Sequence, residues 1–265
     1  MSDMTLLEPV IALVRRAGEA IMAVYAEDFS VEHKDDRSPL TAADRAAHHI
    51  LVDGLAPLGD RIPVLSEESA DIPWSTRQHW QRYWLVDPLD GTREFIKRNG
   101  EFTVNVALID AHRPVLGVVY APALEYLAFA AAGHGAYMRM ANGQDVALST
   151  TRPAAAPLRV AASRSHLDAR TQALLERLGE HDRTGLGSSL KFCRIAEGRV
   201  DLYPRFGPTS EWDTAAAQCV LEQAGGVVIG TDGLPFRYNA KESLLNGDFL
   251  ALGDADLPWR DWLDG

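Results

Sequence analysis

Two aspartates at the end of an apolar run, Asp87 and Asp90, carry the clearest chemical signal in this sequence. The run before them, Trp84-Leu85-Val86, lacks polar alternation and predicts a buried strand, which the Asp-Pro step ends. Carboxylates are hard oxygen ligands, and the Leu89 carbonyl between the two aspartates is a further one. The spacing therefore indicates a site for a divalent cation such as Mg²⁺, although an ordinary turn with Asp90 as its cap uses the same residues.

The residues that follow Asp90 suit an anion. Gly91 can supply the positive φ that a turn needs. Thr92 to Lys97 then predicts the first turn of a helix, whose unpaired amides can meet an anion. A cation site and an anion site would adjoin at this corner of the fold.

Three further acids, Asp44, Glu67 and Asp213, stand at the start of a predicted helix or the end of a predicted strand. Each has an ordinary role available, because acids favour the first turn of a helix and are usually solvated at strand ends. Together with Asp87 and Asp90 they make five acids in such positions, which ordinary roles explain poorly. We therefore expect these carboxylates to converge.

The composition and the net charge disfavour nucleic acids and membranes as partners. The chain has 265 residues, of which 46% are hydrophobic, and a formal net charge of −11. That charge disfavours nucleic acid and anionic membranes, whereas a phosphorylated small molecule is compatible if cations accompany it. No run is long and apolar enough to span a membrane, and the N-terminus lacks a secretory pattern. Cys193 and Cys219 are predicted to be core thiols, which fits a reducing, cytoplasmic setting.

The order of elements predicts an α/β fold with two lobes. In residues 1–150, amphipathic helices precede closely spaced strands typical of an antiparallel meander, and residues 31–41 predict an exposed loop or hairpin. A Pro/Ala-rich passage, Thr151 to Pro157, is the candidate boundary, and residues 151–265 alternate strands and helices. The predicted helices are 6–25, 43–51, 168–178, 190–197 and 212–224, and the predicted strands are 62–66, 84–87, 102–109, 115–121, 126–131, 136–140, 158–162, 201–203, 227–229 and 249–252.

Four motifs occur together and in a fixed order. They are Lys34-x-Asp36-x-Ser38-Pro39-Leu40-Thr41-x-Ala43-Asp44, then Glu67-Glu68, then Asp87-Pro88-Leu89-Asp90-Gly91-Thr92, and finally Trp212-Asp213 with Gly225-Gly226 downstream. In this combination the chain resembles the inositol monophosphatase superfamily over roughly residues 5 to 255. These are Mg²⁺-dependent, lithium-sensitive phosphomonoesterases related to fructose-1,6-bisphosphatase. The resemblance implies their layered αβαβα sandwich, with an α+β N-terminal lobe and an α/β C-terminal lobe.

The resemblance also implies two Mg²⁺ ions, with a third, weaker one in some members. Carried over by motif position, Glu67, Asp87 and the Leu89 carbonyl would hold one ion. Asp87, Asp90 and Asp213 would hold the second, so that Asp87 bridges the two. Two such metals can stabilise both the attacking and the leaving oxygen of an in-line displacement at phosphorus.

Other motif positions imply catalytic roles. Thr92 and Asp44 resemble the pair that orients and deprotonates the attacking water, and Glu67 counts with them as catalytic through its metal. The amides of Gly91 and Thr92 would bind the scissile phosphate. Lys34 would steady its loop or the third metal.

Finer motifs resemble one branch, the CysQ-type 3′(2′),5′-bisphosphate nucleotidases. They are Phe95 to Asn105, Ala162 to His166, Gly187 to Phe192 and Asp201 to Arg205. This branch converts adenosine 3′,5′-bisphosphate, and its 5′-phosphosulfate, to the adenosine 5′ product in sulfate assimilation. The resemblance and their charge make Ser188, Lys191, His166 and Arg205 candidates to contact the second phosphate or the nucleoside. The substrate would also meet the metal-site residues Glu67, Leu89, Asp90, Gly91, Thr92 and Asp213.

Two alternatives remain open at this level. An inositol monophosphatase would use the same metals with a different pocket, and a non-catalytic sensor of phosphorylated ligands would keep the scaffold without the reaction. We expect a monomer or homodimer in the cytoplasm. A peripheral position on the cytoplasmic face of the inner membrane is implied by the resemblance alone.

Overall fold

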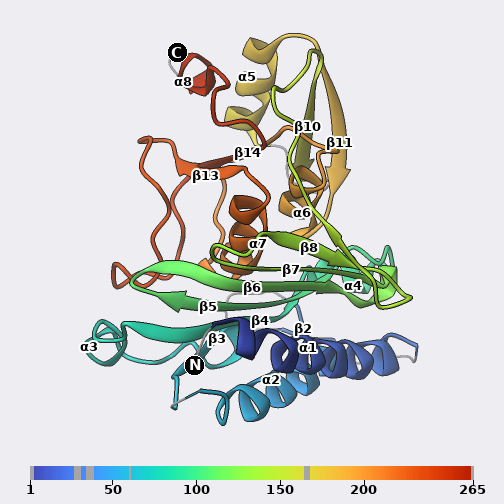
Figure 1. The fold of residues 1–265 in the computed structure, drawn as a ribbon, viewed down its shortest axis with the longest axis vertical. Coiled ribbons are helices and arrows are strands. Elements are labelled where there is room, and N and C mark those ends of the chain that lie inside the picture. Colours follow the sequence, from blue (N-terminus) through green and yellow to red (C-terminus); the bar gives the residue numbers. More distant parts are fainter. Residues whose placement is uncertain (1–2, 27–30, 34–38, 60, 164–167, 264–265) are drawn as a thin grey trace.

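Helices and sheets alternate in five layers along the long axis of the molecule (Figure 1). The computed structural model describes residues 3–26, 31–33, 39–59, 61–163 and 168–263. A pair of helices lies below a large sheet, two helices separate that sheet from a second one, and further helices cover the second sheet. This is the αβαβα arrangement that the resemblance implied.

The lowest layer consists of α1 (Asp3–Tyr25) and α2 (Ala42–Leu55). Apolar residues recur at helical spacing along both helices, and this stripe is buried against one face of the large sheet. The buried residues include Val10, Val14 and Ile21 of α1 and Ala47 and Leu51 of α2. Both helices were predicted from that periodicity, and both are longer than predicted.

The large sheet has seven strands in the order β3-β4-β5-β6-β7-β8-β9. Apart from the parallel β3–β4 pair, all neighbours are antiparallel, which confirms the predicted meander. The strands are β3 (Val64–Ser66), β4 (Arg82–Asp90), β5 (Thr103–Asp110), β6 (Arg113–Ala121), β7 (Tyr126–Ala131), β8 (Ala136–Arg139) and β9 (Asp145–Ala147).

The middle layer is formed by α6 (Leu190–Ala196) and α7 (Glu211–Gln223), which pack on the other face of the large sheet (Figure 1). Small residues allow α7 to approach the sheet closely. A Cβ atom added at Gly117 of β6 would lie 2.3 Å from the Ala216 carbonyl oxygen, so this position requires glycine. The close packing fixes the first turn of α7, which carries Asp213, over the sheet.

The second sheet has five strands in the order β11-β10-β12-β14-β13, with α5 (Ala169–Leu178) and α8 (Trp259–Leu263) on its outer side (Figure 1). The strands are β10 (Leu158–Ser163), β11 (His181–Leu186), β12 (Leu202–Arg205), β13 (Val227–Gly230) and β14 (Phe249–Leu252). The central β10 pairs in parallel with β11 and β12, whereas β12, β14 and β13 pair antiparallel.

Several short elements were not predicted. They are α3 (Trp74–Arg77), β9, β11, α8 and the short 3-10 helices Glu67–Ser69 and Pro122–Leu124. The hairpin alternative for residues 31–41 is confirmed where the structure describes it, as β1 (Val31–His33) pairs with β2 (Pro39–Thr41). The cysteines are free and buried, as predicted.

The predicted lobe boundary falls between the two sheets, since β9 ends at Ala147 and β10 begins at Leu158. One hydrophobic cluster nevertheless contains buried residues from both sheets and from the helices between them. The division into residues 1–150 and 151–265 therefore stays a proposal about how the chain is organised.

Candidate active site

A β-bulge at the end of β4 brings Asp87 and Asp90 to one face of the large sheet. Asp87 lies opposite Asn105 and Asp90 opposite Thr103, so two residues of β4 bulge where β5 has one. Without the bulge, residues three apart would point to opposite faces of the sheet. The prediction that the strand ends at Asp87-Pro88 is therefore wrong, because β4 continues to Asp90 through this irregularity.

The face that Asp87 and Asp90 share is the one covered by α6 and α7. Tyr83 and Leu85 of β4 belong to the cluster between the two sheets, whereas Trp84, Val86 and Leu89 face α1 and α2. Asp87 follows Tyr83 and Leu85 at alternate positions and lies on their face of the sheet, and the bulge places Asp90 on that face as well.

The five predicted acids influence one another strongly. Burial raises the pKa of the Asp87 carboxyl well above its usual value, and the charges of Glu67, Asp90, Asp213 and Asp44 raise it further, in that order. Asp87 and Asp44 are each only 1% exposed. The charges of acids from α2, the end of β3, β4 and the start of α7 thus all act on Asp87, and their convergence on one metal site stays a prediction.

Three of these carboxylates are held by backbone amides. Leu89 N–H donates to Asp87 Oδ1 (3.0 Å), and Ser189 N–H donates to Asp90 Oδ2 (2.7 Å). At the start of α7, Ser210 N–H donates to Asp213 Oδ2 (2.8 Å), which is the helix-capping role considered from the sequence. Each carboxylate keeps a second oxygen for another partner.

As they are oriented here, the described residues include no group of three or more His, Cys, Asp or Glu side chains that could hold a metal ion. The mutual effects on pKa extend over longer distances than metal–ligand bonds, so the two observations agree. Crowded carboxylates repel one another, and amide hydrogen bonds from Ser189 and Ser210 each occupy one oxygen of Asp90 and of Asp213. Small side-chain rotations would be needed to form a coordination shell.

The donor set nevertheless fits a small divalent cation. Burial raises the pKa of Asp213 well above its usual value, and the charges of Asp90 and Glu67 act in the same direction. Several buried acids that cannot all ionise alone are stabilised in their charged form by a cation, and Mg²⁺ prefers oxygen ligands. The chemistry of these residues is therefore that of a magnesium site.

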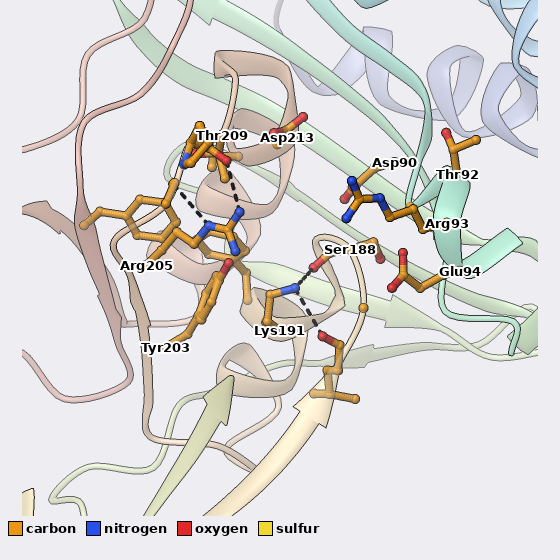
Figure 2. A pocket seen from close by; sticks show the side chains of 18 of the residues that line it. Asp90, Thr92, Arg93, Glu94, Ser188, Lys191, Tyr203, Arg205, Thr209 and Asp213 are labelled. Carbon is orange, nitrogen blue, oxygen red and sulfur yellow. Dashed lines mark hydrogen bonds between the residues drawn. The ribbon is translucent and has the colours of Figure 1, made fainter. Parts of the chain in front are cut away.

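Beside the acids lies a pocket of ≈ 670 Å³ (Figure 2). Asp90, Gly91, Thr92 and Asp213 line one part of it, and Ser188, Lys191, Tyr203 and Arg205 line another. Figure 2 shows Asp90, Thr92 and Asp213 across the pocket from Lys191 and Tyr203. Most of the predicted substrate-binding residues thus line a single cavity, together with the acids Asp90 and Asp213, whereas Glu67 and Leu89 are not among its lining residues.

Gly91 and Thr92 form the corner that the sequence predicted. Gly91 precedes α4 (Thr92–Ile96) with φ 93°, a left-handed conformation that favours glycine. The Thr92 hydroxyl donates to the Leu89 carbonyl at 3.4 Å. The catalytic pairing of Thr92 with Asp44 stays a prediction.

Lys191 is a buried cation in the pocket wall. Its side chain is buried, and its ammonium donates to the carbonyls of Ser188 (2.5 Å) and Leu186 (3.4 Å). It also lies over the Tyr203 ring, 5.0 Å from the centroid. Burial lowers the pKa of Lys191 to about 8, and the Asp90 charge opposes that shift. A negatively charged ligand group would stabilise the protonated form.

Of the other residues predicted to bind substrate or metal, the structure describes Arg205 and Ser188. Arg205 donates to the carbonyls of Gly207 (3.2 Å) and Pro208 (3.0 Å) and lines the pocket. Ser188 has φ 44°, and its buried hydroxyl oxygen has no hydrogen-bond partner. The N-cap of α6 is Ser189, so Ser188 lies one residue before the helix cap. His166 and Lys34 lie outside the described residues.

The inositol monophosphatase family profile matches residues 3–254. The chain belongs to the inositol monophosphatase family. Members of this family are metal-dependent phosphatases that generally use Mg²⁺, which agrees with the donor set described above.

Two relatives and one solved structure illustrate the likeness. The chain is 54% identical to the 3′(2′),5′-bisphosphate nucleotidase CysQ of Escherichia coli O157:H7, over 92% of this chain and 98% of that protein. It is 39% identical to CysQ of Aggregatibacter actinomycetemcomitans, over 96% and 95% of the two chains. The crystal structure of CysQ from Bacteroides thetaiotaomicron superposes with a TM-score of 0.81 at 41% identity, covering 92% of this chain and 96% of that one.

Three polar residues near the acids were not singled out from the sequence: Thr103, Asn105 and Ser189. Thr103 and Asn105 interrupt the apolar run of β5 at alternate positions, a signal of a polar spot on one face of a strand. Ser189 follows Ser188 at the start of a predicted helix, where a capping serine is common.

Within the described residues, no helix is long and apolar enough to cross a membrane.

The metal-free protein is expected to lose stability as pH rises from about 4 to about 7. Burial raises the pKa of Asp90 to about 6 and that of Glu211, the first residue of α7, to about 7. An acid whose pKa is higher in the folded state binds its proton more tightly there, so its contribution is complete at low pH and is lost as pH rises through the folded-state pKa.

Thermal unfolding in a chelator between pH 4.5 and 8 measures this effect. Glu211→Gln should flatten the upper part of the curve, because a glutamine side chain does not titrate. Saturating Mg²⁺ at pH 7.5 should raise Tm, with about 2.7 kcal/mol gained at a concentration of 100 times Kd. A metal-free Tm that rises steadily from pH 5 to 7.5 would contradict the assignment.

Proposed function

We propose that this chain is a Mg²⁺-dependent 3′(2′),5′-bisphosphate nucleotidase, which hydrolyses adenosine 3′,5′-bisphosphate to adenosine 5′-phosphate and phosphate. The same reaction on the 5′-phosphosulfate gives adenosine 5′-phosphosulfate. The observation that carries the proposal is the adjacency, within one pocket, of a carboxylate cluster and the buried cation Lys191. One end suits the phosphate that is cleaved, and the other suits the phosphate that stays. The likeness to CysQ proteins over more than nine-tenths of the chain supports this substrate class.

Two Mg²⁺ ions would be held by the acids. Glu67, Asp87 and the Leu89 carbonyl would hold one ion, and Asp87, Asp90 and Asp213 the other. Bound in this way, Mg²⁺ lowers the pKa of coordinated water and offsets the negative charge on the phosphoryl oxygens. The burial of Asp87 and the effect of the other acids on its pKa support its central place.

The chain itself would position the reactants. The amides of Gly91 and Thr92, at the start of α4, would donate to the scissile phosphate, and the Thr92 hydroxyl would turn from the Leu89 carbonyl toward the attacking water. Asp44, buried near Asp87, would accept the proton through Thr92. Water attacks phosphorus, the bond to the 3′-oxygen breaks, and that oxygen leaves with a proton from solvent.

The opposite wall would recognise the nucleotide. Lys191 would donate to the second phosphate, with Arg205 contributing a second positive charge and the unpartnered Ser188 hydroxyl a hydrogen bond. His166 is a further candidate from the sequence. A monophosphate without this second group would use only half of the site.

A phosphate-release assay with purified protein tests the proposal. Adenosine 3′,5′-bisphosphate is expected to be hydrolysed with a kcat/KM at least about tenfold higher than that for inositol 1-phosphate, because each 1.4 kcal/mol of extra binding gives a factor of ten. A chelator should abolish release, and Mg²⁺ should restore it. A tenfold preference for inositol 1-phosphate would instead indicate an inositol monophosphatase, and no release at saturating Mg²⁺ would indicate a sensor.

A further inference from the structure

Ser189 stands between the two halves of the pocket and contacts both. It is 1% exposed. Its amide donates to Asp90 Oδ2 (2.7 Å), on the side of the acids. Its hydroxyl donates to Asn105 Oδ1 (2.7 Å) and lies 2.8 Å from the Thr103 hydroxyl. One residue thus connects the loop before α6 to β4 and β5.

The three polar side chains form a directed hydrogen-bond chain. The hydroxyl of Ser189 has one proton, which goes to Asn105. Since Ser189 has no second proton, the 2.8 Å contact requires the Thr103 hydroxyl to donate to the Ser189 oxygen. The Thr103 hydroxyl also lies 3.5 Å from Asp90 Oδ2, which is a longer and weaker contact. Buried hydrogen-bond chains of this kind favour one arrangement of the groups they join.

The network is costly in its surroundings, which points to a role other than packing. Thr103 is 0% and Asn105 1% exposed, on the same face of β5 as the apolar Ala107 and Ile109. Ser189 is the N-cap of α6, but its side chain makes no capping hydrogen bond. Burying polar groups is unfavourable unless they are paired, and apolar residues would fill this face at lower cost.

The position of the network in the sheet relates it to the acids. Thr103 is the cross-strand partner of Asp90, and Asn105 is the cross-strand partner of Asp87. Side chains of directly opposed residues in an antiparallel pair lie close together on the same face. The buried Asn105 Nδ2 has no hydrogen-bond partner, so a donor is available on the face that carries the Asp87 carboxylate.

On its other side, Ser189 belongs to a loop built around Lys191. The Lys191 ammonium donates to the carbonyls of Leu186 and Ser188, and the Gly187 amide donates to Glu101 Oε2 (2.9 Å). A Cβ atom added at Gly187 would lie 2.7 Å from the Glu101 carbonyl oxygen, so the loop packs tightly against the segment that leads into β5. A ligand that moves the Lys191 ammonium therefore changes the hydrogen bonds of the loop that leads into Ser189.

We infer that Ser189, Thr103 and Asn105 form a positioning cluster, which couples occupation of the Lys191 end of the pocket to the orientation of Asp87 and Asp90. The inference rests on the proposed function and extends it. A phosphate at Lys191 attracts the ammonium away from the loop carbonyls, and the loop then settles through Ser189 onto Asp90. The distal phosphate thereby favours the carboxylate arrangement that binds a cation.

The probe that tests this is 3′-deoxyadenosine 5′-phosphate, which has the distal phosphate but neither the scissile phosphate nor the 3′-oxygen. It has no group at the reacting position to bind a metal, and binding of Mg²⁺ by its own 5′-phosphate is the same for every variant, so a difference between variants in the effect of Mg²⁺ arises in the protein. Calorimetry would give its Kd in a chelator and in saturating Mg²⁺. For the unmodified chain we expect tighter binding with Mg²⁺ by on the order of tenfold.

Ser189→Ala and Thr103→Val each remove one hydroxyl of the cluster and should reduce this coupling to less than about threefold. Thr103→Ser is the matched control, since it keeps the hydroxyl and should retain the coupling. Tm is measured for each variant, so that an unfolded protein is recognised. Thr103→Val, nearly equal in shape to threonine, serves if Ser189→Ala does not fold.

Equal coupling in Thr103→Val and the unmodified chain would overturn the inference, as would the absence of coupling in the unmodified chain. Hydrolysis of adenosine 3′,5′-bisphosphate, measured in parallel, separates the two claims. If the unmodified chain hydrolyses it but shows no coupling, the positioning role fails and the proposed function stands. If it neither hydrolyses the bisphosphate nor binds the probe, both fail.

Discussion

Asp87→Asn is expected to lower kcat by at least about 10³-fold while making the metal-free protein more heat-stable. Asp87 is the acid whose pKa the other four acids of the predicted site raise, so its charge is central to the cation site and costly without a cation. Asparagine keeps the Oδ1 atom that accepts from Leu89 N–H. At pH 7.5 in a chelator, Tm should rise by about 2–4 °C for each kcal/mol of repulsion that is removed.

The control is Asp71→Asn, which neutralises an exposed acid in the loop after β3. It should change neither kcat nor Tm measurably, because an exposed charge is screened by solvent. Phosphate release and thermal unfolding with and without Mg²⁺ give both readouts. Near-normal turnover in Asp87→Asn would show that this residue does not bridge the metals. A fall in metal-free Tm would show that its charge is not repelled in the folded state.

Lys191→Met should raise KM for adenosine 3′,5′-bisphosphate by about 30-fold or more, because removing one partner of a buried charged hydrogen bond costs roughly 2–5 kcal/mol. Methionine fills most of the space of the lysine stem but has no charge. The same substitution should change KM for adenosine 3′-phosphate less than about threefold. That substrate has the same base and scissile phosphate but lacks the 5′-phosphate.

The comparison of the two substrates separates recognition from general damage. A loop that collapses in Lys191→Met would weaken both substrates alike, whereas loss of the contact to the second phosphate weakens only the bisphosphate. Lys191→Arg should recover part of the difference, since it restores the charge with a different geometry. Equal changes in KM for both substrates would remove Lys191 from the recognition of the second phosphate.

Much of this architecture could be predicted from local sequence signals. The 3.6-residue periodicity of α1 and α2 and the closely spaced apolar runs of β5 to β8 specify their elements, because side-chain burial follows these periods. The corner at Gly91 is likewise local, since glycine readily adopts a positive φ. Short elements such as α8 and the polar edge strand β11 have no periodic signal in the sequence. The strand β11 is determined by its pairing with β10, and the helix α8 by its packing against α5.

The sequence by itself determined which residues could do chemistry: the acids Asp87, Asp90 and Asp213, the Gly91-Thr92 corner and the basic Lys191. Only the tertiary structure decided how they act together. The bulge that turns Asp87 and Asp90 to one face depends on pairing with β5, and the contacts of Ser189 join residues 84 and 99 positions apart in the chain. Propensity acts over neighbouring residues, whereas such contacts depend on how whole layers pack, and it is this packing that buries Lys191 beside the acids.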